Sequence, residues 1–116
     1  MSKLTTHVLD THGGHPAANL RIELHRVGVQ SELVTTQITN TDGRCSKPML
    51  EGSALRIDKY TLTFHVAEYF RAMGVSIPEP AFLDHVVVHF GIADPDQNYH
   101  VPLLVTPWSY SVYRGS

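Results

Sequence analysis

Short runs of alternating apolar and polar residues, separated by turn residues, extend through almost the whole chain. Residues 19–27 place Leu20, Ile22 and Leu24 on one face of an extended backbone, and residues 59–65 repeat the pattern. Such alternation is typical of half-buried β-strands, because successive side chains of a strand point to opposite faces. Many short strands with closely spaced turns indicate an all-β sandwich or barrel.

The same criteria predict eight strands and one helix. The predicted strands cover residues 4–10, 19–27, 33–40, a shorter run that begins at Arg44, 59–65, 84–92, 99–106 and 109–114. The helix is expected at residues 66–73, which are rich in helix formers and are followed by Gly74 as a stop. With 116 residues and no repeat or linker, the chain is expected to form one domain, residues 1–116.

Charge and composition argue against several classes of partner. The formal net charge is -2 and the basic residues are scattered, so we expect no nucleic-acid partner. No apolar run reaches the length of a membrane span, and the N-terminal residues lack a signal-peptide core, so no membrane association is expected. Cys45 is the single cysteine, which excludes an intrachain disulfide and fits a reducing compartment. We therefore expect a soluble cytoplasmic protein.

Two histidines interrupt predicted strands. His7 lies within the first strand and His100 within the seventh, and neither occupies a turn. A neutral imidazole has a pKa close to physiological pH and can act as a general base. A solvated or purely structural histidine is the alternative for each, since histidine is often partly buried without a catalytic role.

Arg44 and the end of the chain are further candidates for a site. Arg44 follows the Asp42-Gly43 turn, where a solvated arginine is also common. The chain ends with Tyr113, Arg114, Gly115 and Ser116, directly after a dense apolar stretch. These polar groups either line a site or form a tail beyond an edge strand.

Neither a metal site nor a cofactor site is expected. His12 and His15 flank a glycine pair that fixes no ligand geometry, so a zinc site is a weak interpretation. A histidine-rich metal-binding sandwich nevertheless remains an alternative for the whole chain. Cys45 has no partner motif and is interpreted as structural.

Three stretches in order carry a family resemblance. They are LTTHVLDTHGGHPAANLRIEL with His7, TNTDGR ending at Arg44, and YHVPLLVTPWSYSVYRGS with His100 and the terminal YRGS. Together they resemble the transthyretin-like family, and more closely its 5-hydroxyisourate hydrolase branch. The YRGS ending is the specific part, because the hormone-carrying transthyretins share the fold but lack it. The sequence departs from the pattern at Asn98, where relatives often have a second histidine, and in the segment SIPEPAFLDH.

The resemblance implies a transthyretin-like sandwich of two four-stranded sheets with one short helix. It places the first, seventh and eighth strands in one sheet, so that His7, His100 and the last residues would lie on adjacent strands. It also implies a homotetramer, with its sites in a channel where dimers meet.

The implied activity is hydrolysis of a ring amide of 5-hydroxyisourate by water during urate degradation, without metal or cofactor. His7, Arg44 and His100 would be catalytic, and the two histidines would divide the base and orienting roles in an order left open. Tyr113, Arg114, Gly115 and Ser116 would bind substrate. The alternative is a transthyretin-like carrier of an aromatic or hormone-like ligand.

Overall fold

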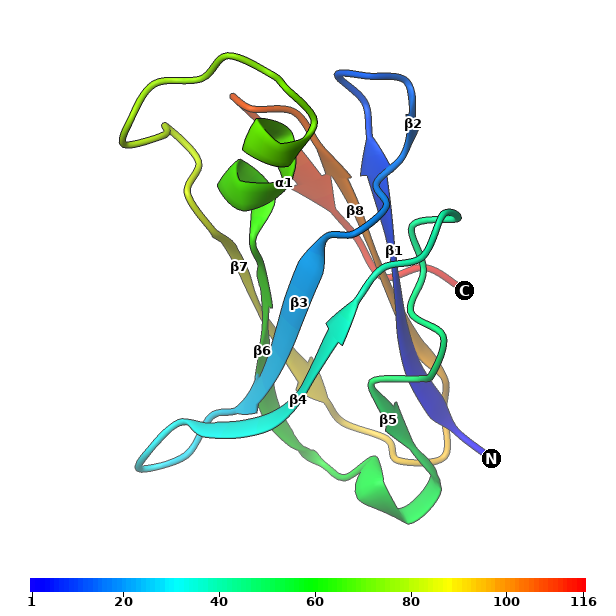
Figure 1. Ribbon diagram of the computed structural model, residues 1–116. Coiled ribbons are helices and arrows are strands. Elements are labelled where there is room, and N and C mark those ends of the chain that lie inside the picture. The colour runs from blue at the N-terminus through cyan, green and yellow to red at the C-terminus, as the bar shows by residue number, and fades with distance from the viewer.

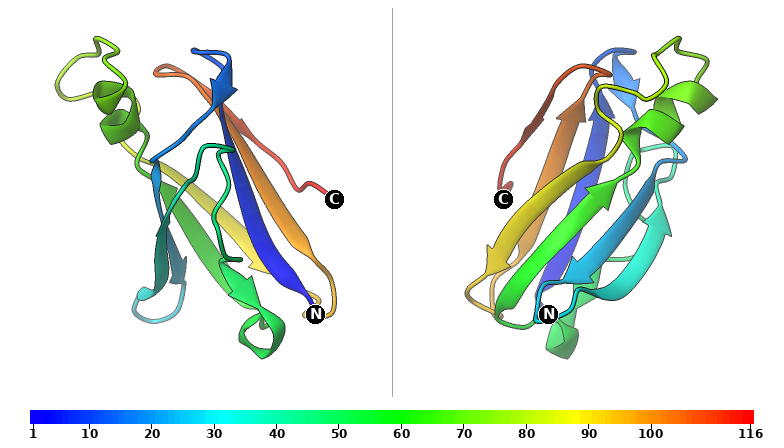
Figure 2. Two further views of the ribbon diagram at one scale, coloured as in Figure 1. Left: turned by 45° about the vertical axis from the view of Figure 1, so that its right-hand side comes forward. Right: turned by 90° about the vertical axis from the view of Figure 1, so that its left-hand side faces the viewer.

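The computed structural model describes residues 1–116 as two β-sheets packed face to face (Figure 1). The first sheet has the order β2-β1-β8-β9, with β5 also paired to β1, and the second has the order β4-β3-β6-β7. The first contains β1 (Lys3–Asp10), β2 (His15–Pro16), β5 (Leu50–Glu51), β8 (Tyr99–Val105) and β9 (Tyr110–Val112). The second contains β3 (Arg21–Arg26), β4 (Glu32–Ile38), β6 (Asp58–Phe64) and β7 (Val86–Ile92). Figure 2 shows the two layers from the side, with helix α1 (Val66–Ala72) at one end.

This two-sheet sandwich with one α-helix confirms the predicted fold class, and the differences concern short elements. The prediction of a strand that begins at Arg44 is wrong, because Arg44 forms only an isolated bridge with His7. The short strand of this region is β5, and a 3-10 turn, η1 (Gly52–Ala54), follows it. One sheet therefore has five strands instead of four, since both two-residue strands, β2 and β5, pair with β1.

Two glycines lie where the sequence predicts a helix end and a turn. Helix α1 ends at Ala72, one residue before the predicted end, and Gly74 follows with a φ of 81°. Gly43 has a φ of 74° in the turn before Arg44, and a side chain there would collide with the carbonyl oxygen of Val8. Only glycine adopts this conformation at so close an approach without strain.

Apolar side chains from both sheets fill the space between the layers. A cluster of 22 buried residues includes Val8 and Leu103 from the first sheet and Ile22 and Leu62 from the second. Phe70 of α1 closes one end of this core and is fully buried. Burial of apolar surface is the main stabilising contribution, at about 25 cal/mol per Å² removed from water.

A buried hydrogen bond joins α1 to the end of β1. The hydroxyl of Tyr69 donates to Oδ2 of Asp10 over 2.8 Å, and Asp10 is 3% exposed. Burial, followed by this hydrogen bond, raises the pKa of Tyr69 well above its usual range. The other carboxylate oxygen accepts from the backbone N–H of Gly13 over 2.7 Å. These two hydrogen bonds satisfy the side chain of Asp10, which would otherwise be costly to bury.

We expect Tyr69→Phe to lower the free energy of unfolding by about 1–3 kcal/mol, because it leaves one buried oxygen of Asp10 without its donor. Urea denaturation monitored by circular dichroism measures the change. Tyr110→Phe is the matched control, since Tyr110 is 46% exposed. Equal stability of the two variants would contradict the assigned role of the hydroxyl.

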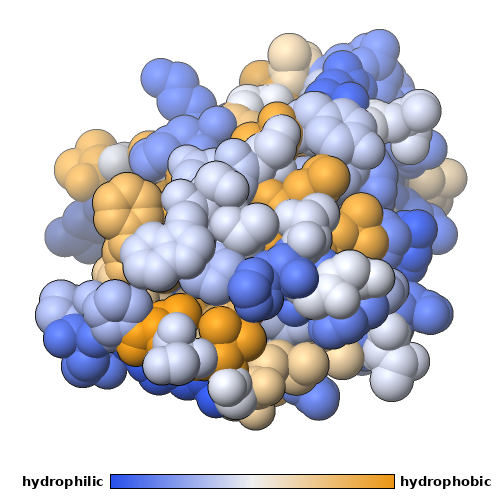
Figure 3. Space-filling model, turned by 90° about the horizontal axis from the view of Figure 1, so that it is seen from above, coloured by the Kyte–Doolittle hydropathy of each residue, from blue (hydrophilic) through white to orange (hydrophobic).

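Apolar residues are also exposed at the end of the sandwich that carries α1. Seen from this end, apolar side chains lie among polar ones over the surface (Figure 3). Phe82 and Trp108 are 71% and 55% exposed, and their ring centroids lie 6.1 Å apart. Neither helix is long and apolar enough for a transmembrane span.

Candidate active site

The parallel pairing of β1 with β8 brings the two strand histidines into one region of the first sheet. Thr5 lies opposite His100 and His7 lies opposite Pro102 in this register. The buried residues of β1 alternate with these positions, so Thr5 and His7 share the face of the sheet that points away from the core. Arg44 joins His7 at the other edge of β1 through the isolated bridge. Three segments far apart in sequence therefore meet around β1 (Figure 1).

A cavity of about 260 Å³ opens over this part of the sheet. It is lined by Thr5, Thr6, Arg44, Cys45, Lys47, His100 and Ser116. Arg44, His100 and Ser116 are thus the predicted site residues that border it directly. Cys45 is the one hydrophobic residue of the lining, and the other six lining residues are polar.

His100 has the properties of a general base in this cavity. Its Nδ1 lies 2.8 Å from Oγ1 of Thr5, which fixes the orientation of the ring. Its pKa is lowered, first because burial disfavours the charged ring and then because Arg44 and His7 are close. The imidazole is therefore neutral at pH 7 and able to accept a proton.

His7 lies beside the cavity and is tied to the turn that carries Arg44. Its Nε2 is 2.8 Å from the carbonyl oxygen of Asp42. A carbonyl oxygen only accepts hydrogen bonds, so Nε2 carries a proton and donates it to Asp42, which leaves Nδ1 outside this contact. His7 does not border the cavity within this single chain.

Gly115 brings the chain end against His100. Its N–H donates to the carbonyl oxygen of His100 over 2.7 Å. A Cβ atom at this position would lie 2.7 Å from Cδ2 of the His100 ring and 3.3 Å from Cγ of Pro102. Glycine is thus required by close packing, and it allows Ser116 to reach the cavity.

Arg114 and Tyr113 turn away from this cavity. The guanidinium of Arg114 donates to Oε1 of Gln97 and to the carbonyl oxygen of Asn98, both over 3.0 Å. Its central carbon lies 4.2 Å from the ring centroid of Tyr99, a cation–π distance. Tyr113 and Arg114 border a different, mainly apolar cavity of about 340 Å³. Substrate binding by these two residues stays a prediction.

Several residues of this region were not singled out from the sequence as site residues. Thr5 orients His100. Its position two residues before His7 could have indicated this, because residues two apart in a strand share a face. Lys47 borders the cavity three residues after Arg44, in a segment with no regular pattern. Asn98, noted as a departure from the family pattern, accepts a hydrogen bond from the Lys3 N–H over 3.0 Å.

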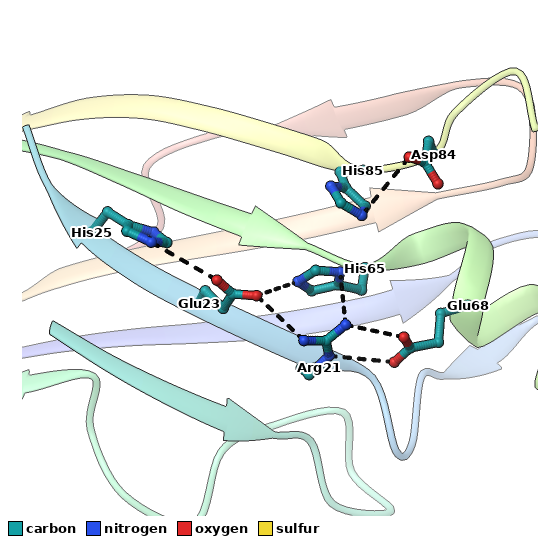
Figure 4. Close-up of polar contacts among 7 residues, drawn as sticks. All are labelled: Arg21, Glu23, His25, His65, Glu68, Asp84 and His85. Carbon is teal, nitrogen blue, oxygen red and sulfur yellow. Dashed lines mark hydrogen bonds and ion pairs between the residues drawn. The ribbon is translucent and has the colours of Figure 1, made fainter. Parts of the chain in front are cut away.

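A separate polar cluster lies on the outer face of the second sheet (Figure 4). Nε2 of His65 is 2.6 Å from Oε2 of Glu23, and Nη2 of Arg21 is 3.3 Å from Nδ1 of His65. Arginine only donates, so Nδ1 of His65 accepts and Nε2 donates to Glu23. Arg21 also pairs with Glu68 of α1 over 3.1 Å. Nowhere in residues 1–116 are three His, Cys, Asp or Glu side chains grouped to hold a metal ion. We therefore describe this cluster as an electrostatic link between β3, the N-cap residue His65 and α1.

This cluster predicts a loss of stability in acid. The pKa of Glu23 is lowered mainly by the hydrogen bond from His65, and that of Glu68 mainly by the hydrogen bond from Arg21. A carboxylate with a lowered folded-state pKa stabilises the fold above its unfolded value and loses this contribution as pH falls through the folded value. We expect the melting temperature to fall below about pH 5, and to fall less in the double variant Glu23→Gln, Glu68→Gln. Thermal unfolding at pH 7 and at pH 3 tests this, and an equal decrease in both proteins would refute it.

Comparison with known proteins agrees with the geometry. The family model described as "HIUase/Transthyretin family" matches residues 4–115. A protein of Pseudomonas aeruginosa named 5-hydroxyisourate hydrolase is 56% identical, over 100% of this chain and 93% of its own length. The crystal structure of an (S)-allantoin synthase superposes with a TM-score of 0.94 at 46% identity, and the chain covers 44% of that longer protein.

A second solved structure matches this chain from end to end. It is the 5-hydroxyisourate hydrolase of Klebsiella pneumoniae, with a TM-score of 0.83 and 30% identity over 100% of each chain. Relatives of this similarity along the full length, together with the family model over almost every residue, establish the assignment. The chain belongs to the HIUase/Transthyretin family.

Proposed function

We propose that this chain hydrolyses 5-hydroxyisourate to 2-oxo-4-hydroxy-4-carboxy-5-ureidoimidazoline, by attack of water on a ring amide in urate degradation. The observation that carries the proposal is the cavity in which a neutral imidazole, a guanidinium and the chain end meet, formed by His100, Arg44 and Ser116. The names of relatives that match the full length support it.

His100 is assigned the role of general base. Its neutral ring takes a proton from water as the water oxygen adds to the ring carbonyl, and the protonated ring then gives a proton to the leaving nitrogen. General bases of this kind contribute about 10²–10⁴ in rate. His7 is the second catalytic histidine: its Nε2–H steadies the turn of Arg44, and its Nδ1 remains for substrate or water.

Arg44 is assigned the role of stabilising the oxyanion that develops on the ring carbonyl. A guanidinium presents planar donors that match carbonyl and carboxylate oxygens, and it stabilises negative charge as it forms. None of the ion pairs of the structure includes Arg44, so its charge is not engaged by a carboxylate side chain. In the proposal Tyr113, Arg114, Gly115 and Ser116 complete the substrate site.

A carrier of an aromatic ligand is the less favoured function. Relatives matched over their whole length are named hydrolases, and six of the seven residues that line the cavity beside His100 are polar. A carrier site would be lined by more apolar groups, which contribute most of the binding energy for an aromatic ligand.

We also propose that the chain works as a cytoplasmic homotetramer. The family resemblance supports this assembly, and the single cysteine fits a reducing compartment. Light scattering coupled to size exclusion measures the assembly, and a monomeric mass for the active protein would refute it.

Mass spectrometry in water enriched with ¹⁸O tests the hydrolase against the carrier. Fresh 5-hydroxyisourate should gain one water, with the label in the new carboxylate, at an initial rate proportional to protein concentration. A rate equal to that of buffer alone, with ligand retained on the protein, would instead support the carrier.

A further inference from the structure

Lys47 is a charged side chain of the cavity that the mechanism above leaves unused. Arg44 and Lys47 are the arginine and lysine side chains of the lining, and no acidic side chain borders the cavity. No ion pair joins either cation to a carboxylate, that of the chain end at Ser116 included. The lining therefore carries two cationic side chains that contact no carboxylate, against the single carboxylate of Ser116, and this balance favours an anionic ligand.

The backbone around Lys47 is held in place at both ends. A hydrogen bond of 2.8 Å joins β1 to the Gly43 carbonyl, and another of 2.8 Å joins the Met49 N–H to β1. Pro48 disfavours the helical conformation for Lys47, and its own carbonyl accepts from Nε2 of Gln37 over 3.3 Å. Lys47 thus extends from a tethered segment that lies along the edge of β1.

Lys47 and His100 belong to opposite sides of the cavity. The segment from Arg44 to Lys47 lies at the edge of β1 that pairs with β5, whereas His100 comes from β8 at the other edge. Thr5 of β1 lies between them in the same lining. A flat ring over Thr5 would have the base on one side and the two cations on the other.

The chemistry of ring opening supplies a matching anion. Water adds its hydroxyl to the carbonyl carbon, the C–N bond breaks, the nitrogen takes a proton, and the resulting carboxylic acid ionises at neutral pH. We propose that Lys47 binds this new carboxylate and sets the preference of the cavity for anionic over neutral ring ligands. The identity of the carboxylate rests on the proposed function, whereas the preference for anions rests on the cavity itself.

Calorimetric binding of two stable ring compounds tests the proposal without turnover. Orotate and uracil share a ring with two carbonyls, and only orotate carries a carboxylate. Lys47→Met should weaken orotate binding about tenfold and leave uracil binding within about twofold, whereas Lys47→Arg should retain orotate affinity. Added salt should weaken orotate binding to the wild type more than uracil binding.

Lys59→Met is the matched control, because Lys59 is an exposed lysine on β6 of the other sheet. The proposal is overturned if Lys47→Met and Lys59→Met bind orotate equally, or if the wild type binds orotate no more tightly than uracil. A protein that shows this Lys47-dependent binding yet leaves 5-hydroxyisourate unchanged would refute the proposed function and keep the anion site. Normal hydrolysis of 5-hydroxyisourate, with orotate binding unchanged in Lys47→Met, would refute the anion site and keep the proposed function.

Discussion

The variant His100→Ala should lower kcat about 10²–10⁴-fold while the protein stays folded, because it removes the base that the cavity provides. The His100 side chain is half-buried on the outer face of the sheet, so its loss leaves the core between the sheets intact. Steady-state kinetics with fresh 5-hydroxyisourate measure the rate, and circular dichroism verifies the fold. His7→Ala is expected to lower kcat by a comparable order, since it frees the turn that carries Arg44.

The control for these variants is His89→Ala. His89 is an exposed histidine on β7 of the second sheet and should be dispensable for activity. The pH profile adds a further criterion: kcat/KM of the wild type should rise with pH through a value below 6.5, because the pKa of His100 is lowered. Near-wild-type rates in both His7→Ala and His100→Ala would remove the histidines from the mechanism.

Deletion of residues 114–116 should reduce kcat/KM about 10²-fold, with little change in the melting temperature. The deletion removes the hydrogen bond from Gly115 to His100 and takes Ser116 out of the cavity wall. Misplacement of a catalytic group by about 1 Å is enough for an effect of this size. The tail adds no side chain to the buried core, so stability should depend on it only weakly.

Point variants separate the parts of this tail. Gly115→Ala should impair activity by itself, because the added Cβ would press on the His100 ring. Arg114→Ala should act through the position of the tail, since Arg114 contacts Gln97, Asn98 and the Tyr99 ring. A truncated or C-terminally tagged protein with full activity would show that the tail is no part of the site.

The alternating strands were predictable from sequence because each buries one face. Period-two patterns at residues 19–27 and 59–65 correspond to β3 and β6, although Asn19, with a φ of 62°, belongs to the preceding turn. The strands β2 and β5 were not predictable, because two residues show no periodicity. Their pairing is decided by β1, whose edge they cover.

The site was only partly predictable, for a topological reason. His7 and His100 come together through the parallel pairing of β1 and β8, whose registers depend on strands distant in sequence. The family resemblance supplied that proximity in advance, and composition alone could not. The direction of Arg114 and the presence of Lys47 in the cavity wall depend on loop geometry that no local pattern encodes.

The most direct test of the hydrolase site is the decay of ultraviolet absorbance of 5-hydroxyisourate, generated in the cuvette by urate oxidase, with and without the untagged protein. We expect wild-type protein to accelerate the decay and His100→Ala, folded and at equal concentration, to leave it unchanged. Decay at the rate of buffer alone in the presence of folded wild-type protein would contradict the assignment of a hydrolase site to the cavity beside His100.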